Sequence, residues 1–373
     1  MQKVKLGEVC EILSGYAFKS SQFNDNKIGL PLIRIRDVER GFSDTYFEGT
    51  YPEEYLIKNG DLLITMDGSF ILKKWEGDLA LLNQRVCKIK ITDKSVDEGY
   101  ISWLIPKFLK EIEDKTPFVT VKHLSVAKIK DISFVLPNKL EQKLIAKKLN
   151  TISQIYDFRK IQSEKFNELV KSRFNEMFGD PVLNEMGWDK HALKEFGIWK
   201  SGGTPKRNEE EFFRGNIPWI TSGELEHKYI EDSFEKITEK AIECSSAKII
   251  EKGSLLLGMY DTAGLKSSIN TKVISCNQAI AFAKLDDKIT NTIYVYYVIQ
   301  NLRSTLLNQQ RGVRQKNFNL SMIKNISIPL PPLALQNEFA DFVAQVDKSQ
   351  LAIQKSLEEL ETLKKSLMQE YFG

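Results

Sequence analysis

Residues 136–179 read LPNKLEQKLIAKKLNTISQIYDFRKIQSEKFNELVKSRFNEMFG, and residues 330–373 read LPPLALQNEFADFVAQVDKSQLAIQKSLEELETLKKSLMQEYFG. Both stretches open on Leu-Pro, close on Phe-Gly and keep one constant offset, so that Gln142 in the first matches Gln336 in the second. Internal repetition constrains the architecture, because each copy is expected to fold as the same kind of unit. The sequence therefore predicts a duplicated, two-headed molecule.

Each of the two stretches predicts one long helix. Apolar residues recur at alternating spacings of three and four, which is the pattern of a coiled-coil seam. About 38 helical residues would form a rod of roughly 55 Å, which is longer than a compact domain of this size is wide. We expect the two helices to pack on each other as an antiparallel coiled coil. The alternative, in which each stripe only docks on its own globular domain, stays open.

The repeat continues outside the helices. Ser14-Gly15 matches Ser201-Gly202, and Asn83-Gln84 matches Asn277-Gln278, with a few extra residues in the second copy. Short β-rich runs lie between Gly, Asn and Asp turns, and helices are expected at residues 6–13, 100–113 and 293–309. The sequence predicts an α+β fold with a pseudo-two-fold repeat: strand-rich domains at residues 1–138 and 181–332, and long helices at residues 139–180 and 333–373.

Composition narrows the class of protein. The chain has 42% apolar and 28% charged residues, and it contains no apolar run of membrane-spanning length and no signal-peptide core. We therefore expect a cytoplasmic protein without a membrane partner. The cysteines and histidines are scattered without ligand spacing, so no metal site is expected. A net charge of +3 does not decide for or against nucleic-acid binding, because one basic face is enough.

Several motifs together resemble a known family. The chain is similar to the specificity subunit of Type I restriction-modification systems, and the resemblance covers all of it in the expected order of domain, helix, domain and helix. It rests on Met177-Phe178-Gly179-Asp180-Pro181, Gly187-Trp188, Ser201-Gly202-Gly203-Thr204-Pro205, Ile217-Pro218-Trp219-Ile220, Ile328-Pro329-Leu330-Pro331-Pro332 with Gln336, and Leu363-Lys364-Lys365-Ser366-Leu367.

The resemblance implies a non-catalytic reader of double-stranded DNA without a cofactor of its own. Such subunits bind two adenine-N6 methyltransferase subunits and, optionally, restriction or motor subunits. Each target recognition domain reads one half of a bipartite target, while the helices set the gap. The heads differ in detail, with Tyr16-Ala17-Phe18-Lys19 where the second has Gly203-Thr204-Pro205-Lys206, so we expect an asymmetric target.

Two other functions stay open. One is a stand-alone nuclease or DNA-modification enzyme, and the other is a protein scaffold without a DNA role. The sequence lacks the tetrapeptides that hold a flipped adenine and the glycine-rich loop that binds ATP. A nuclease-like pattern of Asp131, Glu141 and Lys143 fits better as the start of a helix, where a carboxylate is favourable.

Candidate DNA contacts follow from the chemistry of readout. Lys and Arg bind phosphates, Arg also reads guanine, and polar or apolar side chains read other base edges. Arg34 and Arg36 are expected on one face of a strand, with a carboxylate pair on a neighbouring strand as the alternative. The Asn-Gln pairs are shared by both heads and are expected to be structural. The remaining loops could equally be solvated charge. The candidates are Lys19, Arg34, Arg36, Thr65, Asp67, Ser69 and Lys122 in the first domain, and Thr204, Lys206, Thr221, Tyr260, Arg311, Arg314, Gln315 and Lys316 in the second.

Overall fold

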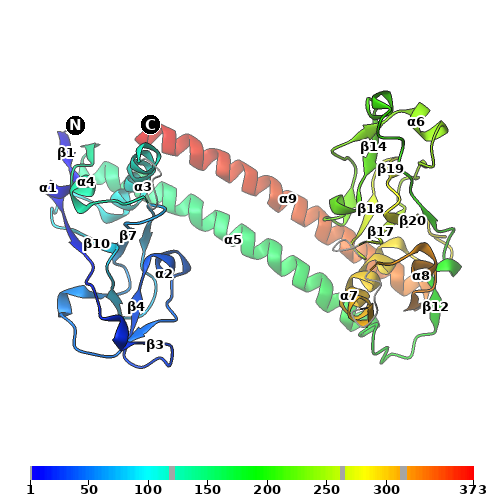
Figure 1. Ribbon diagram of the computed structural model, residues 1–373, viewed down its shortest axis with the longest axis horizontal. Coiled ribbons are helices and arrows are strands. Elements are labelled where there is room, and N and C mark those ends of the chain that lie inside the picture. Colours follow the sequence, from blue (N-terminus) through cyan, green and yellow to red (C-terminus); the bar gives the residue numbers. More distant parts are fainter. Residues whose placement is uncertain (1, 117–121, 261–264, 311–316) are drawn as a thin grey trace. The chain divides into compact units, whose positions relative to one another are not determined.

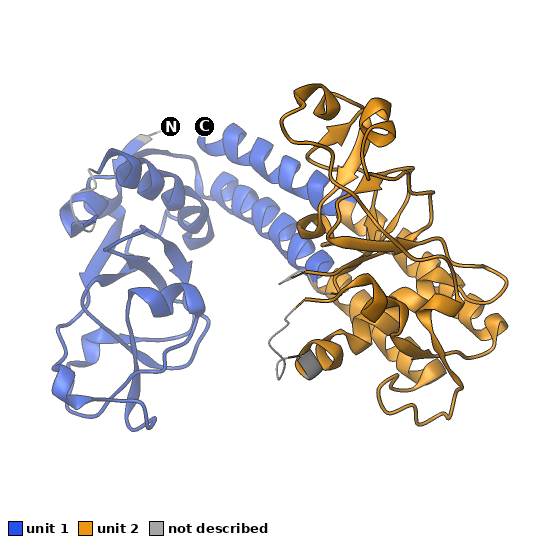
Figure 2. Cartoon of the chain, turned by 45° about the vertical axis from the view of Figure 1, so that its right-hand side comes forward, with its two compact units in different colours: residues 1–160, 355–373 blue, residues 161–354 orange. Residues whose placement is uncertain are grey.

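The structure is a computed structural model that describes residues 2–116, 122–260, 265–310 and 317–373 (Figure 1). The chain forms two compact units, residues 1–160 with 355–373 (unit 1) and residues 161–354 (unit 2). Figure 2 shows that each unit contains one strand-rich head and a part of each long helix. The division therefore runs through both helices, whereas the sequence pattern suggests boundaries between heads and helices.

In the part of the unit 1 head that the structure describes, there are three small sheets and four short or medium α-helices. Their orders are β1-β11, β2-β10-β7-β8 and β3-β5-β4-β9-β6, and all pairings are antiparallel except β4 with β9. The elements are β1 (Gln2–Lys5), α1 (Leu6–Val9), β2 (Cys10–Ser14), β3 (Phe23–Asn24), β4 (Leu30–Ile33), α2 (Ile35–Arg40), β5 (Tyr46–Phe47), β6 (Leu56–Ile57), β7 (Leu62–Thr65), β8 (Leu72–Lys74), β9 (Ala80–Leu82), β10 (Val86–Ile91), α3 (Glu98–Lys115), α4 (Val126–Lys130) and β11 (Ser133–Leu136).

The head of unit 2 repeats this plan. Its sheets have the orders β12-β21, β13-β20-β17-β18-β15 and β16-β14-β19. The elements are β12 (Lys190–Ala192), β13 (Lys200–Ser201), β14 (Ile217–Ile220), β15 (Tyr229–Ile230), β16 (Lys236–Ile237), α6 (Glu239–Glu243), β17 (Leu255–Gly258), β18 (Ser267–Asn270), β19 (Ser275–Cys276), β20 (Ile280–Ala283), α7 (Thr292–Gln310), α8 (Leu320–Lys324) and β21 (Ser327–Pro329). The expected α+β class is confirmed.

The repeat is visible in individual main-chain hydrogen bonds. The N–H of Leu6 donates to Ile132 at 2.8 Å, and the N–H of the matching Leu193 donates to Ile326 at 3.0 Å. These bonds join the start of each head to the residue directly before its last strand. The two heads thus share this framework contact at matching residues, in agreement with the duplication expected from the sequence.

The long helices α5 (Lys139–Phe178) and α9 (Leu333–Phe372) pack antiparallel in each unit. In unit 1 the Tyr156 hydroxyl bonds to Glu361 at 2.7 Å, and the Lys148 ammonium bonds to the Tyr371 hydroxyl at 3.0 Å. In unit 2 the Gln350 amide bonds to Asn167 at 2.8 Å. Residue numbers rise along one helix as they fall along the other, so the expected antiparallel packing is confirmed.

The apolar stripes of the helices also dock on the heads. The core of unit 1 contains Leu149 from α5 and Phe372 from α9, and the ring of Phe372 lies 5.4 Å from that of Tyr100 in α3. In unit 2 the ring of Phe178 lies 4.8 Å from that of Tyr294. Each head therefore packs against the start of the helix that follows it and the end of the other helix. The alternative, in which each stripe only docks on its own domain, is therefore wrong, because the helices also pack on each other.

One expected helix is only half present. Residues 6–13 were expected to be helical throughout, but the helix ends at Val9 and Cys10–Ser14 form strand β2. Cys10 and Ile12 are buried while Glu11 is exposed, and the strand pairs along β10. A short apolar pattern of this kind is compatible with a strand as well as with a helix. Pairing with β10 makes the segment a strand.

Candidate nucleic-acid interface

In both heads, a glycine lies in close contact with another main-chain segment just before the candidate lysine. A Cβ added to Gly15 would lie 2.1 Å from the Asn83 carbonyl oxygen, and one added to Gly202 would lie 2.3 Å from that of Asn277. Only glycine fits such a contact. Lys19 and Lys206 follow these fixed turns, and both side chains are exposed. The structure therefore keeps both lysines at the surface at corresponding positions.

Arg34 and Arg36 do not lie on a strand face, so that expectation was wrong. Strand β4 ends at Ile33, and α2 begins at Ile35. The carboxylate of Asp37 accepts the N–H of Arg34 at 3.0 Å. Asp37 thereby satisfies a main-chain N–H at the start of the helix and turns the chain out of the strand. The carboxylate near these arginines comes from their own helix and not from a neighbouring strand.

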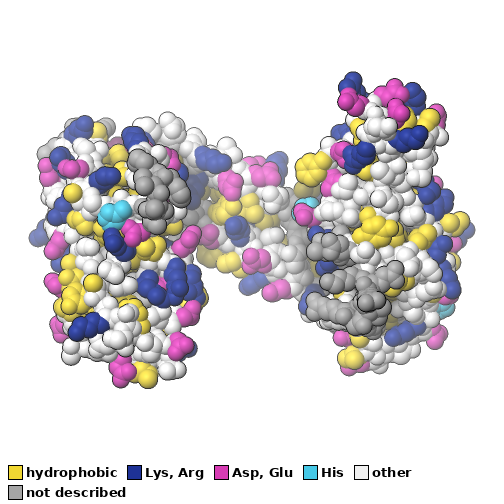
Figure 3. Space-filling view, in the orientation of Figure 1, with side chains coloured by type: hydrophobic (Ala, Val, Ile, Leu, Met, Phe, Trp, Pro, Cys, Tyr) yellow, Lys and Arg dark blue, Asp and Glu magenta, His cyan; other side chains and the backbone are white. Residues whose placement is uncertain are grey.

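The buried carboxylate of Asp37 organises a basic cluster around α2. Asp37 is fully buried, and its oxygens lie 3.8, 3.6 and 3.5 Å from guanidinium nitrogens of Arg34, Arg36 and Arg40. Arg34 also donates to the Thr45 hydroxyl. Figure 3 shows a group of Lys and Arg side chains over α2. The arginine side chains are 31%, 61% and 37% exposed respectively, so Arg36 presents the most guanidinium surface.

A hollow of about 380 Å³ lies beside this cluster. Its walls come from the start of α2 and from the turn between β9 and β10, and they comprise Arg34, Ile35, Arg36, Asn83, Gln84 and Arg85. Two polar atoms of its lining residues, Nε of Arg34 and Oδ1 of Asn83, are buried without a hydrogen-bond partner within the described ranges. Buried polar groups are normally satisfied. Both atoms lie beneath the wall of the hollow, and Nε of Arg34 faces the Asp37 carboxylate at 3.8 Å.

A second network joins three loops next to the hollow. Oδ1 of Asp67 lies 2.6 Å from Nδ1 of His123, and Oδ2 lies 3.4 Å from Nε of Arg85. Nη1 of Arg85 is in turn 3.4 Å from Nδ1 of His123. Asp67 is thus engaged with protein side chains, and it fixes Arg85 at the edge of the hollow.

Of three other candidates in the first head, two make hydrogen bonds within the protein and one has an exposed side chain. The Thr65 side chain is buried, and its hydroxyl donates to the Ser69 carbonyl at 2.6 Å and accepts the N–H of Ile71 at 2.8 Å. The ammonium of Lys122 donates to the Glu113 carbonyl at 2.8 Å, close to the end of α3. Thr65 and Lys122 therefore stabilise a turn and a helix end, whereas Ser69 is exposed.

The second head replaces the arginine cluster with other contacts. The Thr204 hydroxyl donates to the carboxamide oxygen of Gln278. Arg207, which directly follows Lys206, binds both carboxylate oxygens of Glu235 at 2.5 and 2.9 Å. Its guanidinium also lies 4.9 Å from the centre of the Trp219 ring. The hydrogen bonds to Glu235 raise the pKa of Arg207, so this side chain is a fixed cation.

The remaining candidates of the second head differ in their environment. Thr221 uses both its N–H and its hydroxyl to bind the Glu224 carboxylate at 2.7 Å, which closes a short helical turn. Tyr260 follows β17 and is 39% exposed. Four further candidates lie outside the described residues, namely Arg311, Arg314, Gln315 and Lys316.

Sequence reasoning missed Arg85, His123 and Arg207 as candidates. The first two are identified by contacts between loops far apart in the chain, which no local pattern announces. One signal was available for Arg85, because it directly follows the Asn-Gln pair shared by both heads and is matched by Ala279 in the second. A difference next to a shared element marks a position where the heads have diverged.

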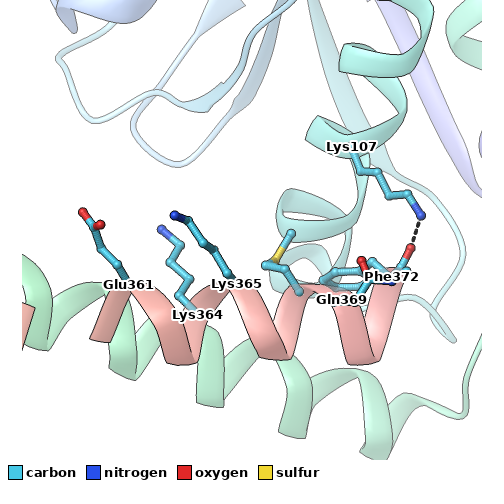
Figure 4. A pocket seen from close by; sticks show the side chains of 8 residues that line it. Lys107, Glu361, Lys364, Lys365, Gln369 and Phe372 are labelled. Carbon is cyan, nitrogen blue, oxygen red and sulfur yellow. Dashed lines mark hydrogen bonds between the residues drawn. The ribbon is translucent and has the colours of Figure 1, made fainter. Parts of the chain in front are cut away.

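Unit 1 has another hollow, of about 660 Å³, beside the end of α9 (Figure 4). Lys107 of α3 donates to the Phe372 carbonyl at one end of it. The rest of the wall is one face of α9 with both charges and apolar atoms, comprising Glu361, Lys364, Lys365, Met368, Gln369 and Gly373. This hollow contains none of the candidate loops. It lies where the end of α9 meets α3 of the head.

No group of three or more His, Cys, Asp or Glu side chains among the residues that the structure describes could hold a metal ion. No helix among those residues is long and apolar enough to cross a membrane.

Comparison with known proteins gives consistent matches over the whole chain. The model of the Type I restriction modification DNA specificity domain matches residues 1–167 and 185–363. The chain is 28% identical to the Type I restriction enzyme EcoBI specificity subunit of Escherichia coli, over 99% of this chain and 85% of that protein. It is 22% identical to the MjaVIII specificity subunit of Methanocaldococcus jannaschii, over 91% of this chain and 84% of that protein.

Solved structures share the fold. The S subunit of a Type I restriction-modification system from M. genitalium has a TM-score of 0.67 at 13% identity, covering all of this chain and 96% of that chain. A structure described as the basis of complex assembly and conformational transition of the type I system has a TM-score of 0.57 at 15% identity, covering all of this chain and 97% of that chain.

Proposed function

Because the chain belongs to the family of Type I restriction modification DNA specificity domains, we propose that it is the sequence-specific DNA-binding subunit of a Type I restriction-modification complex. The observation that carries this conclusion is the double match of the family domain, at residues 1–167 and 185–363. Each match contains one head with the same internal framework. Two reading domains in one chain fit a DNA target that consists of two separate halves.

The two halves of the target are expected to differ in sequence. Arg34, Arg36 and Arg85 of the first head are matched by Thr221, Gly223 and Ala279 of the second. Side chains with different hydrogen-bonding groups read different base edges. The shared main-chain bonds with diverged surface residues thus support an asymmetric bipartite target.

The partners follow from what the two copies share. We infer that two adenine-N6 methyltransferase subunits bind, because a surface that occurs twice in one chain suits two copies of one partner. Restriction or motor subunits would complete a nuclease complex. The chemistry is then supplied by these subunits, and this chain contributes neither a catalytic residue nor a cofactor. A complex that modifies chromosomal DNA would work in the cytoplasm.

The DNA contacts are proposed in two classes. Lys19 and Lys206 are exposed at corresponding positions and suit phosphates, which bind lysine without regard to sequence. Arg36, Arg85 and Tyr260 present donor or ring surface next to the loops and suit base edges. Arg311, Arg314, Gln315 and Lys316 stay proposed contacts of the second head on the strength of their sequence alone.

Methylation mapping tests this function. The chain is co-expressed with the methyltransferase subunit of its own system in a host without adenine methylation, and methylated adenines are located by single-molecule sequencing. We expect methylation at one asymmetric bipartite sequence, and none when this chain is omitted. The purified chain alone should neither methylate nor cleave DNA. Activity of the chain alone that is lost on Asp131→Asn would instead support the stand-alone enzyme.

A further inference from the structure

The hollow between α2 and the turn after β9 has the features of a base-reading site. We propose that it binds the major-groove edge of one guanine in the half-site read by unit 1, with Arg36 and Arg85 as the residues that specify this base. The inference rests on the proposed DNA-binding function and specifies one base that the head of unit 1 reads.

Both arginines are held from behind and present their outer nitrogens. Nε of Arg36 lies 3.6 Å from Asp37, and Nε of Arg85 lies 3.4 Å from Asp67. The side chains nevertheless stay 61% and 53% exposed. Arg36, fixed through Nε, keeps its outer N–H groups for a ligand, whereas Nη1 of Arg85 also lies 3.4 Å from Nδ1 of His123. Guanine presents two adjacent acceptors, N7 and O6, in the major groove, and they match two N–H donors of one arginine.

The turn that carries Arg85 is held rigidly in an unusual conformation. Arg85 has a φ of 74°, in the left-handed region that residues other than glycine seldom adopt. Its carbonyl accepts the N–H of Met66 at 2.8 Å, and the Asn83 N–H donates to Ile33 at 3.2 Å. Strained residues persist where the surrounding structure fixes them, and they concentrate at functional sites. The turn thus holds Arg85 against the hollow at some conformational cost.

The direction of the donors favours a base edge as the ligand. Arg34, Arg36 and Arg40 surround the buried carboxylate of Asp37, and Asp67 lies beside Arg85. No lysine lines the hollow among the residues described. Phosphate binding depends on positive charge that is not already compensated, whereas base reading depends on the direction of donors. Four guanidinium groups share the carboxylates of Asp37 and Asp67, so the cluster stays positive. The direction in which these ion pairs hold Arg36 and Arg85 is what suits a guanine edge.

The second head offers no equivalent site at the matching positions. Thr221 and Gly223 stand in place of Arg34 and Arg36, and the Thr221 hydroxyl is bound to Glu224 at 2.7 Å. Ala279 stands in place of Arg85 and has no donor in its side chain. The guanine contact is therefore expected in one half-site only.

The test compares variants in the reconstituted complex of this chain with its methyltransferase subunit. Arg36→Ala, Arg36→Lys and Arg85→Ala are assayed on a library in which every base of the target is varied in turn. Arg40→Ala is the matched control, because Arg40 belongs to the same helix but pairs with Asp44 at 2.6 Å and does not line the hollow. Circular dichroism and thermal unfolding confirm that each variant is folded.

We expect Arg36→Ala and Arg85→Ala to lose about 10- to 100-fold of the preference for guanine at one position of one half-site. The other half-site and the Arg40→Ala control should keep their preferences. Arg36→Lys keeps the charge but loses the paired donors, so it should resemble Arg36→Ala.

Three results would overturn the proposal in distinguishable ways. A uniform loss of affinity with a smaller salt dependence, restored by Arg36→Lys, would assign the hollow to a phosphate. Unchanged preferences in all variants would make the arginines structural. Absence of any sequence-specific methylation by the unsubstituted complex would instead contradict the DNA-binding function itself.

Discussion

The carboxamide oxygen of Gln142 accepts a hydrogen bond from the main-chain N–H of Asp97 at 2.8 Å. The amide of Gln142 donates to the carbonyls of Pro137 and Ser95 at 2.8 and 3.1 Å. The same arrangement recurs in unit 2, where the matching glutamine, Gln336, binds Asn291 and Pro331 at 2.9 and 2.8 Å. Both glutamines are completely buried. In each unit one glutamine therefore fixes the start of the long helix to the head.

Gln142→Ala is expected to destabilise unit 1 by about 2–4 kcal/mol. The substitution removes three partly buried hydrogen bonds, to the N–H of Asp97 and to the carbonyls of Pro137 and Ser95, and each such bond contributes about 0.5–1.5 kcal/mol. Urea unfolding of the variant measures this loss. Gln154→Ala is the matched control, because Gln154 is an exposed glutamine of the same helix, and its effect should stay within about 0.5 kcal/mol. Equal effects of the two substitutions would contradict the anchoring role.

Gly15→Ala and Gly202→Ala should each destabilise the protein by at least about 2 kcal/mol, in line with other steric clashes in cores. The added methyl group would overlap a main-chain carbonyl in either head, and the loop would have to move. Differential scanning calorimetry gives the shift in melting temperature. Gly223→Ala should be nearly neutral, since a Cβ at that position meets no atom within 4 Å. Neutral substitutions at Gly15 and Gly202 would refute the close approach.

The sequence was sufficient for the features that depend on local pattern. The helices at 100–113 and 293–309 were expected, and α3 and α7 occur at Glu98–Lys115 and Thr292–Gln310. In both segments the apolar pattern continues over more residues than a strand usually has, which favours a helix. The repeat could be recognised because Gly15 and Gln142 recur as Gly202 and Gln336. A tight main-chain contact and a buried amide each restrict the residue type at these positions.

The features that depend on distant partners could not be predicted. Cys10–Ser14 is a strand because β10 pairs with it, although its residues also fit a helix. Arg36 lies in a helix because the Asp37 carboxylate bonds to the Arg34 N–H. Arg85 belongs to the candidate site because Asp67 and His123 come from other loops. The site therefore required the structure, whereas the family resemblance did not.

The buried phenol of Tyr100 should make unit 1 sensitive to alkaline pH. Tyr100 is 2% exposed and packs against Phe372. Burial, with a smaller effect of the Glu141 charge, raises the pKa of Tyr100 from 10.0 to about 12. A pKa that is raised in the folded state stabilises the fold below pH 10, and this contribution is lost as the pH rises from 10 to 12.

Tyr100→Phe removes the ionisable group and keeps the ring. The variant should therefore lose less stability between pH 10 and pH 12, by up to about 2–3 kcal/mol at 1.36 kcal/mol per pKa unit. Urea unfolding of both proteins at pH 9, 10, 11 and 12 measures the difference. Parallel stability curves for the two proteins would show that Tyr100 does not titrate in this range.

A partly buried ion pair should hold α9 against the head of unit 2. Oδ1 of Asp347 lies 2.5 Å from the ammonium of Lys228, and the Tyr229 hydroxyl donates to Oδ2 at 2.8 Å. The charged side chains are only 16% and 20% exposed. Burial lowers the pKa of Lys228, although Asp347 opposes this effect. Removal of the carboxylate would leave a buried ammonium without its counter-charge.

Asp347→Ala should therefore cost about 1.5–3 kcal/mol near neutral pH, in the range of hydrogen bonds to charged groups. The loss should shrink as the pH rises, because Lys228 then gives up its proton and no buried charge remains. Asp341→Ala, at an exposed position of the same helix, is the control and should change little. Adding Lys228→Met to Asp347→Ala should recover part of the stability, since it removes the unpaired charge. A penalty that is independent of pH and unrelieved by Lys228→Met would mean that Asp347 acts through packing and not through its charge.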